Sequence, residues 1–320
     1  MIKDPKIIAF VSAPSTLNAQ ERIAWLSALN ASLNEAIVID LAHMSAAQKQ
    51  SCTIAIVANS DPADLLTLPN LQWVHSVWAG VERLVQDLGK MRLPIVRLVD
   101  PQLAKTMAEA VLAWTLYLHR DMPAYAQAQR SGRWQPRDYV KPEQRRISVL
   151  GLGELGRASC AALLAAHFNV QGWSREPRVI AGLRCFAGLD NLPRLLSTTD
   201  ILICLLPLTV NTRHLLNVQT LSLLPKNASI INFARGLIID DAALRCALDS
   251  EYLDHAVLDV FATEPLAAES WHWNHPKVTV TPHVSAPTDI SSASAIVCAN
   301  VNRYFATGEI PLAVNPVTGY

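Results

Sequence analysis

The sequence has few charged residues and no excess of either sign. Asp, Glu, Lys and Arg make up 17% of the 320 residues, and 27 basic residues balance 27 acidic ones. About 25% charged residues is typical of globular proteins. The chain lacks the basic surface that binding to nucleic acid or an anionic membrane requires, so we expect neither partner. With 51% hydrophobic residues it can bury a large core, which excludes a disordered protein.

Cysteines are few and scattered. The six cysteines form no CxxC pair, so neither a zinc site nor a disulfide framework is expected. His272 and His275 stand three apart, like two metal ligands, but the segment ends at Pro276 with no cysteine near it, and we expect no metal. No apolar run reaches the roughly 18 residues of a membrane-spanning helix, and the start of the chain lacks a signal peptide's apolar stretch. We therefore expect a cytoplasmic protein.

Short β-branched runs alternate with longer helical patterns along most of the chain, which is typical of parallel α/β layers. The first series of predicted strands covers residues 6–11, 36–41, 53–58, 73–77 and 95–99. The second series covers residues 147–150, 170–173, 201–205, 229–233, 256–260 and 278–281. Helices are predicted over 101–120 and 289–306, and the polar, proline-containing stretch 132–145 is predicted to be a loop. Two α/β domains suit this length, at roughly 100–200 residues per domain.

A glycine-rich loop lies between a predicted strand and an apolar helix. Gly151, Gly153 and Gly156 form a GxGxxG pattern in the strand–turn–helix context of a dinucleotide-binding site. The first glycine allows the tight turn, the second lets a pyrophosphate approach, and the third lets helix and strand pack closely. Free N–H groups at the helix start favour phosphate, which makes Glu154 and Leu155 candidate contacts as well. The loop predicts a dinucleotide cofactor.

The next strand ends at Trp173, where NAD-binding proteins usually place Asp or Glu for the ribose 2′-hydroxyl. Ser174 and Arg175 follow instead. Ser174 carries no charge that repels a 2′-phosphate, and Arg175 can pair with one. These two residues favour NADPH. Glu176 can reach the ribose if the loop is shifted, so NAD stays possible.

Candidate residues, most of them polar, also follow the other strands of the second series. Because ligands of open α/β sheets bind beyond the carboxyl ends of the strands, these residues are candidates for a site. They are Pro207, Thr212, Ala234, Arg235, Asp259, Glu264 and His283.

Three of these residues suit the reduction of a carbonyl group. His283 can hold and release a proton near neutral pH. Glu264 can orient the imidazole ring and stabilise its charged form. Arg235 can bind a carboxylate in bidentate fashion and polarise the adjacent carbonyl. The sequence therefore predicts a 2-oxo acid as substrate.

With these residues, the sequence resembles the D-isomer-specific 2-hydroxyacid dehydrogenases, and most of all their glyoxylate/hydroxypyruvate reductase A branch. The matching segments are residues 78–82, 107–109, 132–136, 151–156, 173–175, 206–209, 232–236, 258–261, 263–266 and 281–284. The resemblance implies two Rossmann- or flavodoxin-like, doubly wound α/β domains with a cleft between them. Residues 1–99 plus 286–320 would form the substrate domain and residues 100–285 the dinucleotide-binding domain.

The resemblance also implies roles for individual residues. Arg235 would bind and polarise the substrate, His283 would be the general acid/base, and Glu264 would be its partner. Asp259 and the region of Ala234 would hold the nicotinamide end of the cofactor.

On the substrate side, the resemblance implies that the N–H groups of Ala79 and Gly80 bind the substrate carboxylate. The sequence departs from much of the wider family at Trp78, where Gly is common. This tryptophan either narrows the pocket in favour of small substrates or packs in the core. A homodimer through the helix from Pro101 is also implied, and Trp134 then either reaches the partner's substrate site or only anchors its own loop.

The main functional hypothesis is an NADPH-dependent reductase of glyoxylate or hydroxypyruvate. One alternative is an NAD-dependent D-2-hydroxy acid dehydrogenase of the phosphoglycerate or lactate type, which Ser174 and Trp78 disfavour. Another is a nucleotide-sensing binding protein like the C-terminal-binding corepressors. We expect the enzyme, because 320 residues leave no length for added partner-binding tails.

Overall fold

The computed structural model describes residues 5–13, 16–88 and 93–315. The chain divides into two compact units. Unit 1 takes its described residues from Met1–Gln102 and Thr288–Tyr320, and unit 2 is Leu103–Pro287. Among the described helices, none combines the length and the apolar character needed to cross a lipid bilayer.

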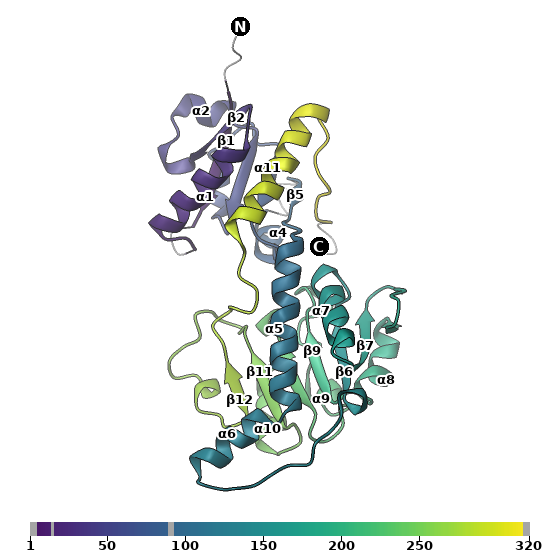
Figure 1. The fold of residues 1–320 in the computed structure, drawn as a ribbon. Helices are drawn as coiled ribbons and strands as arrows, with labels where there is room; N and C mark the ends of the chain where they lie inside the picture. The colour runs from purple at the N-terminus through teal and green to yellow at the C-terminus, as the bar shows by residue number, and fades with distance from the viewer. Residues whose placement is uncertain (1–4, 14–15, 89–92, 316–320) are drawn as a thin grey trace. The chain divides into compact units, whose positions relative to one another are not determined.

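Unit 1 is built on a parallel five-stranded sheet in the order β2-β1-β3-β4-β5. Figure 1 labels β1, β2 and β5 of this sheet. The strands are β1 (Lys6–Ser12), β2 (Ala36–Asp40), β3 (Ile54–Ala58), β4 (Trp73–Ser76) and β5 (Ile95–Val96). The helices are α1 (Ala19–Ser32), α2 (Ala46–Ser51), α3 (Pro62–Leu65), α4 (Glu82–Leu88) and α11 (Ile290–Thr307), with a 3-10 turn η1 (Leu41–His43). This strand order is that of a flavodoxin-like, doubly wound sheet.

The first and last helices of unit 1 cover the same face of its sheet. Helix α1 is preceded by Asn18, whose side chain caps the helix in a reciprocal pair with Glu21. Along α11, Val297 and Val301 are fully buried in the cluster that also holds Trp25 of α1. The last helix of the chain, α11, thus completes the hydrophobic core of unit 1 to which the first helix, α1, also belongs.

Unit 2 contains a parallel seven-stranded sheet in the order β12-β11-β10-β9-β6-β7-β8. The strands are β6 (Arg146–Leu150), β7 (Asn169–Ser174), β8 (Arg184–Ala187), β9 (Ile201–Cys204), β10 (Ser229–Asn232), β11 (His255–Leu258) and β12 (Val278–Val280). The helices are α5 (Pro101–His119), α6 (Met122–Arg130), α7 (Glu154–Ala165), α8 (Leu192–Leu196), α9 (Val218–Leu221) and α10 (Asp241–Asp249). Four 3-10 turns are η3 (Pro142–Gln144), η4 (Leu189–Asn191), η5 (Gly236–Ile238) and η6 (Trp271–Trp273). The order contains the Rossmann sequence 3-2-1-4-5-6 with one further strand at the edge.

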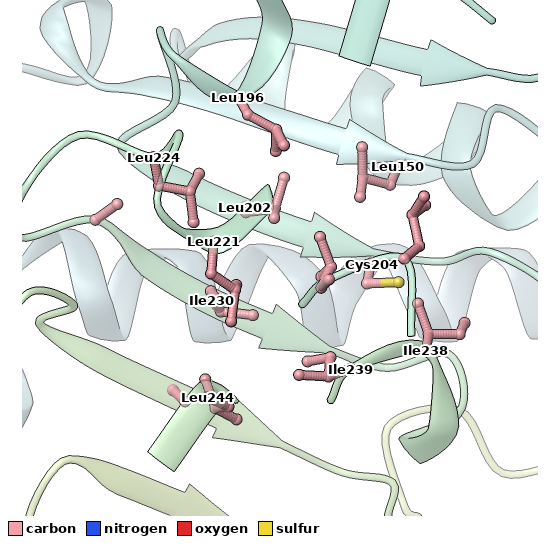
Figure 2. Packing of buried hydrophobic residues seen from close by; sticks show 14 of the residues in the cluster. Leu150, Leu196, Leu202, Cys204, Leu221, Leu224, Ile230, Ile238, Ile239 and Leu244 are labelled. Atoms are coloured by element: carbon pink, nitrogen blue, oxygen red, sulfur yellow. The ribbon is translucent and has the colours of Figure 1, made fainter. Parts of the chain in front are cut away.

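The core of unit 2 lies on both faces of this sheet. On one face, Leu202 and Ile230 of adjacent strands pack with Leu221 and Leu244 of the covering helices (Figure 2). On the other face, the buried positions of α5, Met107, Val111 and Leu118, pack against β6. The two doubly wound α/β domains predicted from the sequence are confirmed.

Among the elements of unit 2 that were not predicted are one strand and one helix. Strand β8 is a short edge strand that opens with Arg184, and helix α6 follows Asp121, which adopts a left-handed backbone conformation (φ +55°). In unit 1, the strand predicted over 95–99 ends at Val96, and the N–H of Leu98 donates to the carbonyl of Trp78 outside the sheet ladder.

Candidate active site

The glycine loop joins β6 to α7 at the carboxyl edge of the unit 2 sheet. Gly151 has a φ of +104°, and an added Cβ there would lie 2.7 Å from the carbonyl oxygen of Leu205. An added Cβ at Gly156 would lie 1.7 Å from the carbonyl oxygen of Gly151. Around Gly153, in contrast, a Cβ would meet nothing within 4 Å. The outer two glycines are therefore needed for packing, and the middle one opens onto free space.

This loop fits a pyrophosphate group. Gly153 precedes the first residue of α7, and no side chain caps the helix. Uncapped N–H groups and the helix dipole favour a negative charge at this end. Glu154 forms an ion pair with Arg157 on the exposed side of the first turn. The contacts predicted for Glu154 and Leu155 stay predictions.

The end of β7 carries the residues predicted to face the cofactor ribose. The Ser174 hydroxyl donates to the carbonyl of Glu176 at 2.7 Å. The Arg175 guanidinium lies 3.0 Å from the Glu176 carboxylate, and both side chains are exposed. Arg175 is thus at the surface, where its charge is paired with that of the Glu176 carboxylate.

The turn after β9 is held by hydroxyl groups. The Thr212 hydroxyl donates to the carbonyl of Pro207 at 2.7 Å and accepts from the N–H of Thr209 at 2.7 Å. Thr212 therefore fixes the shape of the turn that carries Pro207. Contact of either residue with a cofactor stays a prediction.

Arg235 follows β10 in a turn that Asn232 organises. The buried Asn232 side chain accepts from the N–H of Ala234 at 3.1 Å and donates to the carbonyl of Arg235 at 3.1 Å. The Arg235 guanidinium donates to the carbonyl of Ala234 at 2.6 Å. At Gly236, an added Cβ would lie 2.0 Å from the carbonyl carbon of Phe261. Only glycine lets the arginine turn approach the loop after β11 this closely.

Asp259 holds the loop that carries His283. Its carboxylate, on a residue that is 2% exposed, accepts from the hydroxyl of Thr281 at 2.6 Å and from the N–H groups of Val284 and Ser285 at 2.9 Å each. The N–H of His283 donates to the Asp259 carbonyl at 2.9 Å. His283 itself has a φ of +55°, a backbone conformation that is uncommon for residues other than glycine. The four hydrogen bonds that Asp259 accepts stabilise this conformation.

His283 and Glu264 form a hydrogen-bonded pair. Nδ1 of His283 lies 2.7 Å from Oε2 of Glu264, whose Oε1 accepts from the N–H of Phe261 at 2.9 Å. The His283 side chain is 52% exposed. Within the described part of the chain nothing hydrogen-bonds Nε2, so this atom can face a substrate.

The pair shifts both pKa values toward the charged forms. The hydrogen bond to the Glu264 carboxylate and its negative charge raise the pKa of His283, against the opposing effects of burial and of the Arg235 charge. Burial alone would raise the pKa of Glu264, but the hydrogen bonds from His283 and Phe261 and the positive charges of His283 and Arg235 lower it. The arrangement thus favours an imidazolium beside a carboxylate, with a guanidinium near both.

Three residues of this site have roles that the sequence reasoning missed. Asn232 and Thr281 position the loops of Arg235 and His283. The hydroxyl of Ser285 is buried without a hydrogen-bond partner, close to the Asp259 carboxylate that its own N–H contacts. An unsatisfied polar atom of this kind suits a polar group of a bound molecule.

The residues predicted to bind substrate outside this sheet lie in two places. Trp78, Ala79 and Gly80 follow β4 in unit 1, where the Trp78 ring is half-buried and meets Trp25 edge-on at 6.1 Å between centroids. Trp134 lies in the loop after α6 and is 99% exposed. Its side chain thus packs little against its own subunit, and the role of Trp134 stays a prediction.

His272 and His275 contact different carboxylates. His272 is buried and its Nε2 lies 2.8 Å from Asp241, whereas Nε2 of His275 lies 3.1 Å from Asp249. No cluster of three or more His, Cys, Asp or Glu side chains suited to a metal ion occurs among the residues that the structure describes.

A known family and several curated proteins are similar to this chain. Residues 112–285 match the family described as D-isomer specific 2-hydroxyacid dehydrogenase, NAD binding domain. The glyoxylate/hydroxypyruvate reductase A of Yersinia enterocolitica is 34% identical over 302 residues, which cover 92% of this chain and 96% of that protein. That of Serratia proteamaculans is 33% identical, over 93% of this chain and 95% of that protein.

Solved structures are similar over nearly the whole chain. A D-isomer specific 2-hydroxyacid dehydrogenase from Xanthobacter autotrophicus Py2, in complex with NADPH and MES, matches with a TM-score of 0.92 and 36% identity, covering 99% of this chain and 100% of that one. An NADPH-dependent glyoxylate/hydroxypyruvate reductase from Sinorhizobium meliloti, in complex with NADP and sulfate, matches with a TM-score of 0.87 and 32% identity, covering 98% and 100%. The chain therefore belongs to the D-isomer specific 2-hydroxyacid dehydrogenases and is an NAD(P)-dependent oxidoreductase.

Proposed function

We propose that this protein reduces a small 2-oxo acid, glyoxylate or hydroxypyruvate, to the 2-hydroxy acid with NADPH. The observation that carries the proposal is the His283–Glu264 pair with the charge of Arg235 beside it, on the sheet edge that also holds the glycine loop. The names of the similar reductases from Yersinia enterocolitica and Sinorhizobium meliloti support the substrate class.

Each residue of the site has a separate role in the proposed reaction. The Arg235 guanidinium binds the substrate carboxylate and polarises the neighbouring carbonyl. His283, held as imidazolium by Glu264, gives its proton from Nε2 to the oxygen of the forming alcohol. Asp259 and Asn232 keep the two loops in place. A reduced nicotinamide, when bound, would supply the hydride.

NADPH is proposed over NADH because Ser174 and Arg175 stand where an NAD-binding protein usually has an acidic residue. The exposed Arg175 can exchange Glu176 for a 2′-phosphate, which carries more charge. The NADPH and NADP complexes of the similar structures support this preference.

We further propose a homodimer in the cytoplasm. A tryptophan that is 99% exposed suits a surface covered by a second copy, and Trp134 would then reach the partner's substrate. Binding of the substrate carboxylate by Ala79 and Gly80 belongs to the same proposal.

Steady-state oxidation of NADPH and NADH with glyoxylate and hydroxypyruvate tests the proposal. His283→Ala should lower kcat by about 10²–10⁴-fold, the usual share of general acid catalysis, while NADPH still binds. Arg235→Ala should raise KM as well as lower kcat, because the arginine holds the carboxylate before and during the reaction. Near-normal turnover of His283→Ala would require another proton donor and a new assignment of the site.

A further inference from the structure

The amino edge of the unit 2 sheet, where its strands begin, carries buried polar atoms that lack hydrogen-bond partners within the described part of the chain. They are Oγ1 of Thr115, both ring nitrogens of His119 and Nε of Arg145. Thr115 is fully buried and His119 is 3% exposed. His119 is the last residue of α5, and Arg145 directly precedes β6. All three residues belong to unit 2.

The other side chains lie near the His119 ring. Thr115 comes one helical turn before His119, so both face the same side of α5. The His119 ring meets that of Phe168, just before β7, edge-on at 5.0 Å between centroids, and that of Tyr139 at 6.1 Å. Tyr139 belongs to the loop that leads to Arg145, and the charge of Arg145 is close enough to act on the imidazole. The end of α5, the loop and the start of the sheet thus come together here.

Two guanidinium groups act on this ring without acidic partners of their own. Burial and the charges of Arg145 and Arg120 lower the pKa of His119, whereas the charge of Asp121 raises it. Neither Arg120 nor Arg145 forms an ion pair with an acidic side chain among the residues that the structure describes. The Asp121 carboxylate lies 2.8 Å from the guanidinium of Arg137 and is already paired.

The negative features nearby do not cancel this charge. The carboxyl end of α5 carries roughly half a negative charge. Burial raises the pKa of Asp254, and the charges of Arg137, Lys277 and Arg145 lower it, so this carboxylate also lies among cations. Four cationic side chains, Arg120 included, thus stand against Asp121, Asp254 and the helix end, and the surplus is positive.

The unpartnered atoms require an acceptor that brings negative charge. The Nε–H of Arg145 can only donate, and the imidazole of His119 has at least one N–H to donate. The Thr115 hydroxyl can donate to the same group. A buried donor that is charged and unpaired costs more free energy than a neutral one. A water molecule would leave the charge of Arg145 unpaired, whereas an anion satisfies both the hydrogen bonds and the charge.

We propose that Thr115, His119 and Arg145 bind a small inorganic oxyanion of the phosphate type, with Arg120 adding positive charge beside it. The ion is small because Thr115 and His119 are buried. Its oxygens accept from all three side chains and join the end of α5 to the loop that returns to β6. The site lies at the edge of the sheet opposite to Arg235 and His283, so the bound ion stabilises unit 2 and takes no part in the proposed reaction.

Thermal unfolding of the full-length protein saturated with NADP tests the inference, because NADP then occupies the phosphate positions of the cofactor site. Sodium phosphate is titrated against sodium chloride at equal pH and ionic strength. Phosphate about tenfold above its Kd should raise Tm by about 3–5 °C. Arg145→Met should weaken phosphate binding by about 10- to 100-fold, and the isosteric Thr115→Val by about 3- to 10-fold. Arg303→Met, at an exposed position on α11 in unit 1, is the matched control and should bind phosphate like the wild type.

NADPH fluorescence titration shows that the variants are folded, because their cofactor affinity should stay at the wild-type value. If Arg145→Met does not fold, Thr115→Val decides the outcome, since it keeps the shape of the side chain. An equal phosphate effect in the wild type and in both variants would overturn the inference. A Tm that phosphate and chloride change equally, or that phosphate leaves unchanged, would overturn it as well, because a general salt effect or water would then account for the site. None of these outcomes bears on the proposed reaction.

Discussion

Nδ1 of His283 lies 2.7 Å from Oε2 of Glu264, which joins the loops after β12 and β11. The contact settles which ring nitrogen can face a substrate, because Nδ1 is engaged. Gly236 brings the Arg235 turn against the same β11 loop. The imidazole of His283, its carboxylate partner Glu264 and the guanidinium of Arg235 thus follow the ends of three neighbouring strands.

The pair predicts a specific pH dependence of the reductive reaction. The proposed reduction needs the imidazolium form of His283, which is present below its pKa, and Glu264 raises this pKa. Glu264→Gln should lower the pKa of His283, so reductive activity should be lost at a lower pH than in the wild type. Activity on the acidic side of the pH profile should change less. Glu269→Gln, an exposed carboxylate nearby in the chain, is the control. An unchanged upper limb of the kcat/KM profile in Glu264→Gln would contradict the role given to the pair.

The glycine loop offers a test that separates cofactor binding from folding. Gly153→Ala should fold normally, because a Cβ there meets nothing within 4 Å, yet bind NADPH more weakly, since the methyl group occupies the space of the pyrophosphate. Gly156→Ala should instead lower the unfolding free energy by about 1–3 kcal/mol or more through overpacking. Thermal unfolding and NADPH fluorescence titration measure the two effects. Wild-type NADPH affinity in Gly153→Ala would rule out the proposed phosphate site.

Cofactor preference should respond to charge at the end of β7. Ser174→Asp should shift the preference toward NADH by repelling a 2′-phosphate, and a charge-assisted contact of Arg175 with that phosphate should contribute about 1.5–3 kcal/mol. Ser174→Ala is the matched control, because it loses the same hydrogen bond to Glu176 without adding a charge. The ratio of kcat/KM for NADPH and NADH measures the effect. Equal or better use of NADH by the wild type would refute the preference.

The features predicted from sequence are those that depend on local pattern. The glycine loop could be located because three glycines follow an apolar strand, and the turn geometry requires them at those positions. Arg235 and His283 could be proposed because each directly follows a short apolar run, and parallel strands end at one edge. Strand β8 was missed because it is short, lies at the edge and begins with a charged residue.

The features that could not be predicted depend on contacts between distant segments. Asp259 has the sequence signal of a strand-end carboxylate, but only the fold shows it accepting bonds from Thr281, Val284 and Ser285. The sequence likewise gives no sign that the hydroxyl groups of Ser12 and Ser60 lack hydrogen-bond partners, because a serine at a strand end usually bonds to a protein group or to water.

The exposed Trp134 lies in the loop that follows α6. Its loop is anchored in the same subunit, since the N–H of Arg137 donates to the Tyr125 hydroxyl at 3.1 Å and the Arg137 guanidinium lies 2.8 Å from Asp121. The tryptophan itself is 99% exposed, so we expect a second copy of the chain to cover it. Sedimentation should find a homodimer at working concentration, and Trp134→Ala should lower kcat/KM whereas the exposed Trp273→Ala should not.

Mixed dimers distinguish action on the partner's substrate from action within one subunit. Trp134→Ala and His283→Ala subunits should each be poorly active alone. Co-refolded, they should regain activity above the sum of the two, because one site of the mixed dimer then combines an intact His283 with the Trp134 of the partner subunit. If Trp134 acts only within its own subunit, no site of the mixed dimer contains both residues and no gain will be seen. A monomer by sedimentation would end the proposal of a shared site altogether.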